Sequence, residues 1–371
     1  MMEHPVFLIV NAGSSSVRLA LFQRNEKGLV YLALERHEQI VPDTEFLRAL
    51  LTRVKVKPTL VAHRFVHGGK LSQSARIDHA VRAELERCAP LAPLHNPVAL
   101  SWLDAALALQ TPALPQVAVL DTSFYAELPE RATTYGLPQS ITREYGLRRY
   151  GFHGIAHEAM WRAWCELRPD LPRGGRLISV QLGSGCSVTA TLEGQAIDTS
   201  MGYTPTEGLM MATRSGDIDA GLIIYLQREG ITLDALEQML TRTGGLAGIS
   251  GISGDFRVLL ASDDAAARLA VEVFCYRVRK YIGAYIASLG GLDGIVFGGG
   301  TGEHQPRIRQ GILNGLDELG ISLDAGRNEH AVGIAARISS DGSRVDVRVQ
   351  PVDEARVMAQ AALEIYNARD I

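Results

Sequence analysis

The pattern of apolar and polar positions predicts strands that alternate with helices along the whole chain. Short apolar runs that end in glycine or polar turns are typical of strands. Such runs occur at residues 6–10, 60–62, 117–120, 177–180 and 294–297. The clearest helix is expected at about residues 263–289, where apolar residues keep three-four spacing on one face. We expect an α/β fold in which this helix joins the core or contacts a second copy of the chain.

Two strand–turn–strand segments repeat at an offset of 170 residues. NAGSSS at residues 11–16 and QLGSGC at residues 181–186 each stand between two apolar runs, and Val10 and Gly13 fall on Val180 and Gly183. Turns of this composition present backbone N–H groups and hydroxyls at one point, as a phosphate cradle does. The repeat predicts a duplicated domain that binds a polyphosphate and catalyses phosphoryl transfer. Two unrelated hairpins with small turn residues are the plainer alternative.

The length of 371 residues exceeds what one hydrophobic core usually serves, so two domains are expected. No linker of biased composition marks the boundary, and we place it by motif near residue 150. The prediction is a first domain at residues 1–150 and a second at residues 151–352. The last helix, at residues 353–371, is expected to pack back on the first domain.

Composition excludes several classes of protein. With 46% hydrophobic and 21% charged residues the chain resembles an ordinary globular protein, and a net charge of −4 gives no basic surface for nucleic acid. The four cysteines lie far apart and form no CxxC pair, which disfavours a metal knuckle or redox motif. No apolar run approaches the roughly 20 residues that a bilayer requires, and the apolar run near the start is too short for a signal peptide. The expected compartment is the cytoplasm.

Four further segments carry residue types suited to a ligand site. Arg64 lies in HRFVHGG at residues 63–69, Arg214 lies in TRSGDID at residues 213–219, and Asp121 ends an apolar strand. Open α/β sheets bind ligands at such strand ends. GGGTGE at residues 298–303 closes another strand with a group of backbone donors. Taken singly, each segment is equally consistent with a salt bridge or a tight turn.

Two HxxxH pairs, His63 with His67 and His153 with His157, raise the question of a metal hydrolase. Nearby glycines, Gly154 among them, argue against long regular helices there, and no Glu follows the first His as zincins require. The chain also lacks GxxxxGK[ST] and a GxGxxG that follows a strand with an acidic partner. A nucleotide would therefore be bound by the two hairpin turns.

Seven motifs together resemble the acetate kinase family and occur in the family's order. They are NAGSSS (11–16), HRFVHGG (63–69), APLHNP (92–97), DTSF (121–124), YGFHG (150–154), DTSMGYTPTEGLMMATRSGDID (198–219) and GGGTGE (298–303). The resemblance implies two duplicated ribonuclease-H-like domains of the actin and sugar-kinase type with an interdomain cleft. It also implies a homodimer that reversibly transfers phosphate from ATP to acetate with Mg²⁺, giving acetyl phosphate and ADP.

The same resemblance implies roles for individual residues. Asp121, His153 and Arg214 would be catalytic, Arg64 would bind the substrate carboxylate, and Asn11 and Glu354 would bind magnesium. The acyl pocket would be lined by Val66, Leu94, Phe152 and Pro205. Nucleotide contacts would come from Arg18, Gln181, Leu182, Gly183, Ser184, Gly185, Asp255, Phe256, Arg257, Gly300, Thr301, Gly302, Glu303 and His304. Acetate is already ionised at neutral pH, so Asp121 is interpreted as an orienting group rather than a base.

The chain departs from the family on the side of the phosphoryl donor. QLGSG at residues 181–185 stands for the family's HLGNG, Arg18 for its lysine, Asp255-Phe256-Arg257 for its DMR, and GTGEH at residues 300–304 for its GIGEN. A diphosphate-dependent acetate kinase therefore stays as an alternative, and propionate kinase is the alternative that differs in the acceptor. A non-catalytic, actin-like nucleotide sensor is the alternative from another class, but it would not need a carboxylate-binding arginine beside a phosphoryl-binding one.

Overall fold

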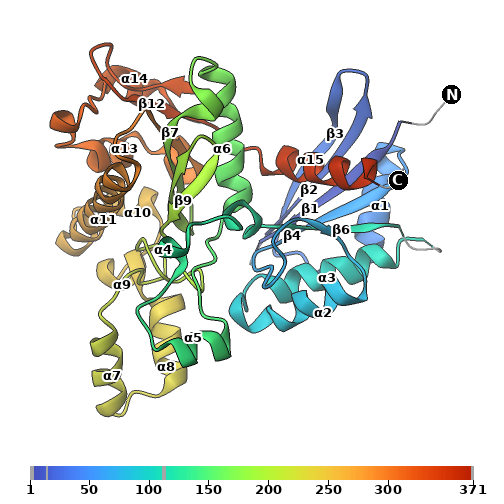
Figure 1. Ribbon diagram of the computed structural model, residues 1–371, viewed down its shortest axis with the longest axis horizontal. Helices are drawn as coiled ribbons and strands as arrows, with labels where there is room; N and C mark the ends of the chain where they lie inside the picture. Colours follow the sequence, from blue (N-terminus) through green and yellow to red (C-terminus); the bar gives the residue numbers. More distant parts are fainter. Residues whose placement is uncertain (1–3, 14–15, 111–113, 369–371) are drawn as a thin grey trace. The chain divides into compact units, whose positions relative to one another are not determined.

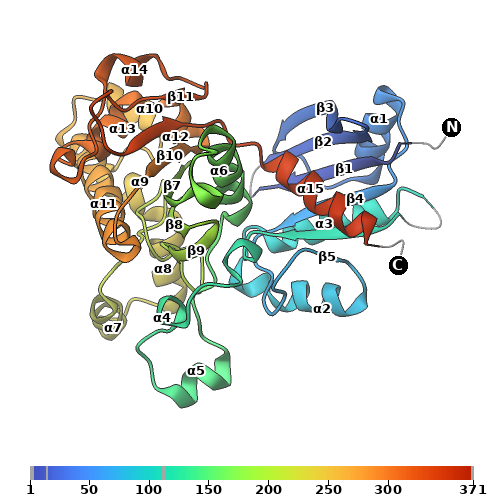
Figure 2. The same ribbon diagram turned by 45° about the horizontal axis from the view of Figure 1, so that its top comes forward.

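Two units of the chain each contain one six-stranded mixed sheet (Figures 1 and 2). The computed structural model describes residues 4–13, 16–110 and 114–368, so Ser14 and Ser15 of the first glycine-serine turn lie outside the described residues. Unit 1 comprises Met1–Ala126, Phe152–Ala159 and Asp353–Ile371, and unit 2 comprises Glu127–Gly151 and Met160–Val352. The division predicted at residue 150 assigns residues 127–150 to the first domain, whereas in the structure they group with unit 2.

The sheet of unit 1 has the strand order β3-β2-β1-β4-β6-β5. Its strands are β1 (Val6–Ala12), β2 (Ser16–Asn25), β3 (Gly28–Glu38), β4 (Leu60–Phe65), β5 (Ala75–Arg76) and β6 (Gln116–Leu120). Its helices are α1 (Thr44–Val54), α2 (His79–Arg87), α3 (Asn96–Leu107) and α15 (Glu354–Asn367), with short 3₁₀ turns at η1 (Ala89–Leu91) and η2 (Ser123–Tyr125). β1, β4 and β6 run parallel, which places their carboxyl ends at one edge.

Both faces of this sheet are covered by helices, because successive side chains of β1 point to opposite faces and all seven residues of β1 are buried. Leu8 packs in a cluster with residues of α1 and α3, whereas Phe7 and Ile9 pack with Met358 and its neighbours on α15. Figure 1 shows α15, in red, on one side of the strands and α3 on the other. The helix predicted at the C-terminus is present, and it contacts β1, β4 and β6.

The sheet of unit 2 has the order β11-β12-β10-β7-β8-β9. Its strands are β7 (Arg176–Leu182), β8 (Cys186–Leu192), β9 (Gln195–Thr199), β10 (Gly294–Gly298), β11 (Ala336–Arg337) and β12 (Asp346–Val349). Its helices are α4 (Glu130–Thr133), α5 (Gln139–Tyr145), α7 (Ala220–Arg228), α8 (Leu233–Gln238), α9 (Gly245–Ser250), α10 (Phe256–Ala261), α11 (Ala265–Leu289), α12 (Gly299–His304), α13 (Pro306–Leu313) and α14 (Ala325–His330). Helix α6 (Gly154–Leu167) contributes its first residues to unit 1 and the rest to unit 2.

The two sheets repeat the same topology strand by strand. β7, β8 and β9 form an antiparallel meander like β1, β2 and β3, and the parallel set β7, β10 and β12 corresponds to β1, β4 and β6. In each unit a two-residue strand closes the far edge by antiparallel pairing. The duplicated α/β fold predicted from the repeat of the glycine-serine turn is therefore confirmed.

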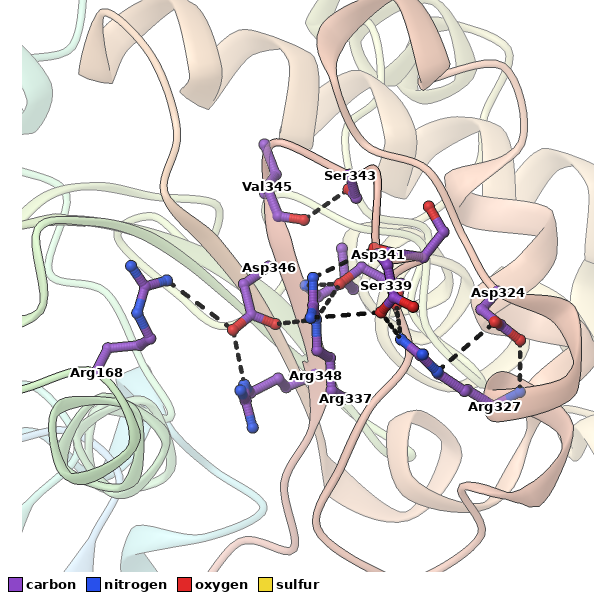
Figure 3. Close-up of polar contacts among 12 residues, drawn as sticks. Arg168, Asp324, Arg327, Arg337, Ser339, Asp341, Ser343, Val345, Asp346 and Arg348 are labelled. Atoms are coloured by element: carbon purple, nitrogen blue, oxygen red, sulfur yellow. Dashed lines mark hydrogen bonds and ion pairs between the residues drawn. The ribbon is translucent and has the colours of Figure 1, made fainter. Parts of the chain in front are cut away.

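Three arginines surround one buried carboxylate at the edge of the second sheet (Figure 3). Asp346, the first residue of β12, lies 3.0 Å from Nε of Arg348, 3.4 Å from Nε of Arg337 and 3.9 Å from Nη1 of Arg168. Further ion pairs with Asp341 and Asp170 balance these positive charges. The cluster thus lies where β12 pairs with the two-residue edge strand β11, and its charges are compensated within unit 2.

Candidate functional site

A buried arginine–aspartate pair lies at the carboxyl edge of the unit 1 sheet. Arg64 is on β4 and Asp121 directly follows β6, its parallel neighbour, so the two side chains meet. Nε of Arg64 donates to both carboxylate oxygens at 3.2 Å, and Nη2 donates to Oδ2 at 2.7 Å. Burial raises the pKa of Asp121. The charge and hydrogen bonds of Arg64 and a hydrogen bond from the His153 backbone act to lower this pKa, but burial outweighs them. Burial acts to lower the pKa of Arg64, but the carboxylates of Asp121 and Glu354 outweigh it and raise that pKa.

Asn11 and Glu354 complete this cluster, although they are 343 residues apart. Asn11, on β1, accepts from Nη1 of Arg64 at 3.2 Å and donates to Oε2 of Glu354 at 2.7 Å. Glu354 lies 3.8 Å from Nη1 of Arg64. The N-cap of α15 fixes its position, because Asp353 accepts from the Arg356 backbone N–H and from the Tyr31 hydroxyl.

His153 adopts a backbone conformation that non-glycine residues rarely take. Its φ is +59°, in the left-handed region, and such strain clusters at functional sites. The next residue, Gly154, donates its N–H to the Asp121 carbonyl at 3.1 Å, and a Cβ on Gly154 would approach that oxygen to 2.0 Å. Gly154 is thus required where the chain passes Asp121. The expectation that it would oppose a long helix was wrong, since α6 starts there.

The predicted acyl-pocket residues of unit 1 lie in the connections that leave this edge. Val66 follows β4 and is 6% exposed, and Phe152 is fully buried. The carbonyl of Phe152 accepts from the Tyr125 hydroxyl at 2.9 Å, and its ring packs edge-on against that of His67 with centroids 5.4 Å apart. Leu94 is half-buried before α3.

Arg214 is a largely desolvated cation in unit 2. Its Nη1 donates to the Pro205 carbonyl at 3.0 Å and lies 3.5 Å from the Met211 sulfur. Burial lowers the pKa of Arg214, and no carboxylate of the described chain stands within ion-pair distance to offset that burial. A buried cation with neutral neighbours is the arrangement that an anionic ligand would stabilise.

Two of the predicted nucleotide segments lie side by side in unit 2. β7 and β10 pair so that Gln181 faces Gly298, and a Cβ on Gly299 would approach the Leu182 carbonyl to 2.6 Å. Gly183 and Gly185 close the β7–β8 hairpin with Ser184 exposed between them. The Oε1 atom of Gln181 is buried and has no hydrogen-bond partner among the described residues. Such an atom at a glycine-rich turn indicates a site for a ligand donor or a bound water.

Other predicted nucleotide residues use their side chains within the protein. Oε1 of Glu303 accepts from the backbone N–H groups of Gly299 and Val352 at 3.0 and 3.1 Å. Phe256 is buried against Phe274. Asp255 caps α10 and pairs with Arg257, whose side chain is 80% exposed. His304 is exposed, Gly302 is buried, and Gly300 and Thr301 lie on α12 with them, whereas Arg18 is exposed on β2 of unit 1.

Comparison with known proteins identifies the relatives. Residues 44–360 match the Acetokinase family. The chain belongs to this family. It is 38% identical over an alignment of 396 positions to an acetate kinase of Bacteroides fragilis, covering 97% of this chain and 99% of the relative.

Two solved structures share the fold over nearly the full length of this acetokinase-family chain. The acetate kinase of Porphyromonas gingivalis superposes with a TM-score of 0.84 and 34% identity, over 98% of this chain and all of that one. A propionate kinase of Francisella tularensis superposes with a TM-score of 0.88 and 32% identity, over 96% and 98% of the two chains. The resemblance inferred from the motifs is confirmed at the level of family and fold.

The oxygens of Asn11 and Glu354 suit a hard cation such as magnesium. Mg²⁺ prefers oxygen ligands, is bound through one or two carboxylates and keeps several waters. The two side chains touch through Nδ2 of Asn11, so a direct ligand from Asn11 would be Oδ1, the same oxygen that accepts from Arg64. Groups of three or more His, Cys, Asp or Glu that could hold a metal are absent from the described residues, so water and substrate would have to supply the remaining ligands.

Sequence reasoning missed Arg149, which fixes the segment before Pro205. Its Nη1 donates to the carbonyls of Thr199, Ser200 and Met201, and its Nη2 pairs with Glu207 at 2.6 Å. A half-buried arginine that satisfies loop carbonyls has no local sequence signature, because these four partners are 50 or more residues away.

In the described part of this acetokinase-family chain, no helix is long and apolar enough to cross a membrane.

Proposed function

We propose that the chain transfers the γ-phosphoryl group of ATP to acetate, reversibly, giving acetyl phosphate and ADP. The observation that carries this proposal is the Arg64 guanidinium. Buried Asp121 orients it and leaves some of its N–H donors available for a substrate carboxylate. Membership of the Acetokinase family and relatives named acetate kinase support the same activity.

Arg64 would bind the acetate carboxylate. A guanidinium carries five N–H donors, and Asp121 and Asn11 engage three of those of Arg64 in the described part of the chain. One donor on each terminal nitrogen would then face acetate in the bidentate geometry that Arg–carboxylate pairs favour. Acetate needs no base, because a carboxylic acid of pKa about 4 to 5 is ionised at neutral pH. Asp121 would hold Arg64 in place.

Arg214 and His153 would stabilise the phosphoryl group in transit. Phosphoryl transfer passes through a loose transition state whose negative charge is spread over three oxygens, and positioned cations lower its energy. The uncompensated burial of Arg214 supports this role, since a phosphoryl group would supply the missing negative charge. The left-handed backbone of His153, packed on Asp121, supports a role for its imidazole as a hydrogen-bond donor to the same oxygens.

Asn11 and Glu354 would hold Mg²⁺, directly or through water. The ion would screen the charges of the phosphate oxygens when it is bound. The positive charge of Arg64 at 3.8 Å from Glu354 opposes a bare cation there, so we expect metal binding to strengthen when a polyphosphate is present.

Val66, Leu94, Phe152 and Pro205 would enclose the acyl chain. A valine leaves room for one methyl group and crowds a second carbon, so acetate is the preferred acceptor. Propionate is the second candidate, favoured by the likeness to a structure named as a propionate kinase.

ATP is the proposed donor, bound by the segments at residues 181–185, 255–257 and 300–304 together with Arg18. Three features support this: an oxygen of Gln181 that has no partner among the described residues, the exposed Arg257 and the exposed His304. Glu303 and Phe256 would act only by shaping the segments, because their side chains are occupied. Diphosphate is the alternative donor, since the departures from the family lie in these segments.

A second copy of the chain is the proposed partner, and the cytoplasm the proposed compartment. α7 exposes Leu222, Ile224 and Tyr225 to between 42% and 56%, and Leu269 and Tyr276 are exposed on α11. Each of these two helices thus exposes more than one large apolar side chain, which a second copy of the chain would cover. Size-exclusion chromatography with light scattering should give twice the mass of 40.2 kDa, and a monomer would contradict this part of the proposal.

Trapping of the acyl phosphate tests the function. The purified chain is incubated with hydroxylamine, Mg²⁺, one acceptor (acetate or propionate) and one donor (ATP, GTP or diphosphate). We expect hydroxamate with ATP and acetate, and less with propionate. If hydroxamate forms only when diphosphate is the donor, diphosphate replaces ATP as the proposed donor. If no pair of donor and acceptor gives hydroxamate, the proposal is refuted.

A further inference from the structure

Asn96 connects two loops through one fully buried carboxamide. It is the first residue of α3 and has no exposed surface. Its Oδ1 accepts the backbone N–H of His67 at 3.2 Å, and its Nδ2 donates to the His67 carbonyl at 2.9 Å. The side chain thus pairs with both polar groups of one backbone residue, as a neighbouring β-strand would.

The residue that Asn96 holds lies among three proposed walls of the acyl pocket. Val66 immediately precedes His67, and the Phe152 ring packs against the His67 ring. Leu94 stands two residues before Asn96 itself, and the backbone N–H groups of His95 and Asn96 fold back on the Ala92 carbonyl at 3.0 Å. The carboxamide therefore fixes the segment that carries Val66 relative to the segment that carries Leu94.

Other contacts leave the His67 loop little freedom to adjust. The Gly68 N–H donates to the Thr122 hydroxyl at 3.3 Å, and a Cβ on Gly68 would approach a Leu120 methyl to 2.7 Å. The Gly69 N–H donates to Nδ1 of His67 at 3.0 Å. Because the loop is packed this closely, loss of the Asn96 pairing would be expressed as a shift at Val66.

We infer that Asn96 is a positioning residue that sets acyl-chain specificity, by holding the Val66 and Leu94 walls at a fixed separation. The inference rests on the proposed function and on the placement of Val66 and Leu94 in the acyl pocket. Asn96 touches no substrate. It acts through the His67 backbone, so its effect falls on which acyl group fits.

Asn96→Asp is the sharpest test, because it keeps the shape and the acceptor for the His67 N–H but loses the donor to the His67 carbonyl. One methylene in such a pocket changes kcat/KM by about 10-fold to 200-fold, and we expect Asn96→Asp to reduce the acetate-to-propionate ratio by about threefold to tenfold. The change should lie in the KM for acetate, with kcat within about threefold. If this variant does not fold, Asn96→Ser, which carries no charge, takes its place.

A double-mutant cycle and a stability control separate positioning from general destabilisation. If Asn96 acts through Val66, Asn96→Asp should change the ratio less in a Val66→Ala background than in the wild type. Leu47→Ala, on the buried face of α1, should lower the melting temperature and leave the acetate-to-propionate ratio unchanged.

An unchanged ratio in a folded Asn96 variant, or additive effects in the cycle, would overturn the inference while leaving the proposed function intact. A wild-type chain that forms no acyl phosphate would instead refute the proposed function.

Discussion

Asp121 is fully buried and accepts hydrogen bonds from both Nε and Nη2 of Arg64, the shortest at 2.7 Å. The pair spans two adjacent parallel strands, so the sheet itself sets the direction of the guanidinium. Asn11 and Glu354 then meet the opposite side of Arg64. The four side chains form one network whose members depend on one another.

Asp121→Asn should impair catalysis by misorienting Arg64. A displacement of about 1 Å at a reacting group lowers the rate by about 10²-fold. We expect kcat/KM for acetate to fall by about that factor or more. Breaking a buried ion pair also costs about 3–5 kcal/mol of stability. Activity assays and denaturant unfolding measure the two effects, and a variant within tenfold of wild type with unchanged stability would contradict the role of the pair.

Arg214→Ala should lower kcat by about 10³ to 10⁵, the range for arginines that stabilise a transferred phosphoryl group. Stability should change little, because Arg214 contacts a carbonyl and a thioether and its burial is not offset by a carboxylate of the described chain. Steady-state kinetics and thermal melting are compared. Loss of less than tenfold in a variant that melts normally would remove Arg214 from the mechanism.

Glu354→Gln should raise the magnesium concentration needed for half-maximal rate more than it raises the KM for acetate. Gln keeps the shape and one oxygen but removes the charge that favours a divalent cation. The variant is titrated with Mg²⁺ at saturating ATP and acetate. An unchanged magnesium dependence would argue against the placement of the metal at Asn11 and Glu354.

Val66→Ala should narrow or reverse the preference for acetate, mainly by improving the KM for propionate. We expect the wild type to prefer acetate by about 10-fold to 200-fold in kcat/KM. If Val66 is only a core residue, the variant loses stability while the ratio of the two substrates stays constant. Measuring this ratio for both proteins distinguishes the two cases.

Acid should destabilise the chain through His63. Burial lowers the pKa of His63 to about 4 from an ordinary value of 6.5. Between these values the unfolded chain binds a proton that the native chain does not, so stability falls as pH falls through that window, by at most about 1.4 kcal/mol per unit. Melting temperatures of wild type and His63→Gln are compared from pH 7 to about 4, with exposed His79→Gln as the control. If the melting temperature falls equally with pH in all three proteins, His63 is not a source of the acid destabilisation.

The sequence predicted the parts of this account that depend on local pattern. Strand ends bearing Arg64 and Asp121 follow apolar runs, and parallel strands bring their carboxyl ends to one edge. The grouping of residues 127–151 with unit 2 was not predictable, since it depends on contacts such as those of Arg149 with carbonyls 50 residues away. The carboxylate of Glu303 looked free for a nucleotide, but it bonds to backbone N–H groups at the start of α12. Tertiary contacts decided both cases.

Reversible transfer of phosphate between ATP and acetate can be followed directly by ³¹P NMR of two reaction mixtures, one for each direction. The purified chain, Mg²⁺, ATP and acetate are followed over time, and acetyl phosphate and ADP are then supplied in a second tube. With the wild type we expect acetyl phosphate and ADP signals to grow together in the first tube and an ATP signal to grow in the second. Arg214→Ala should lose both changes. If neither tube changes with folded wild-type protein, or if inorganic phosphate is the only product, the chain does not transfer phosphate to acetate.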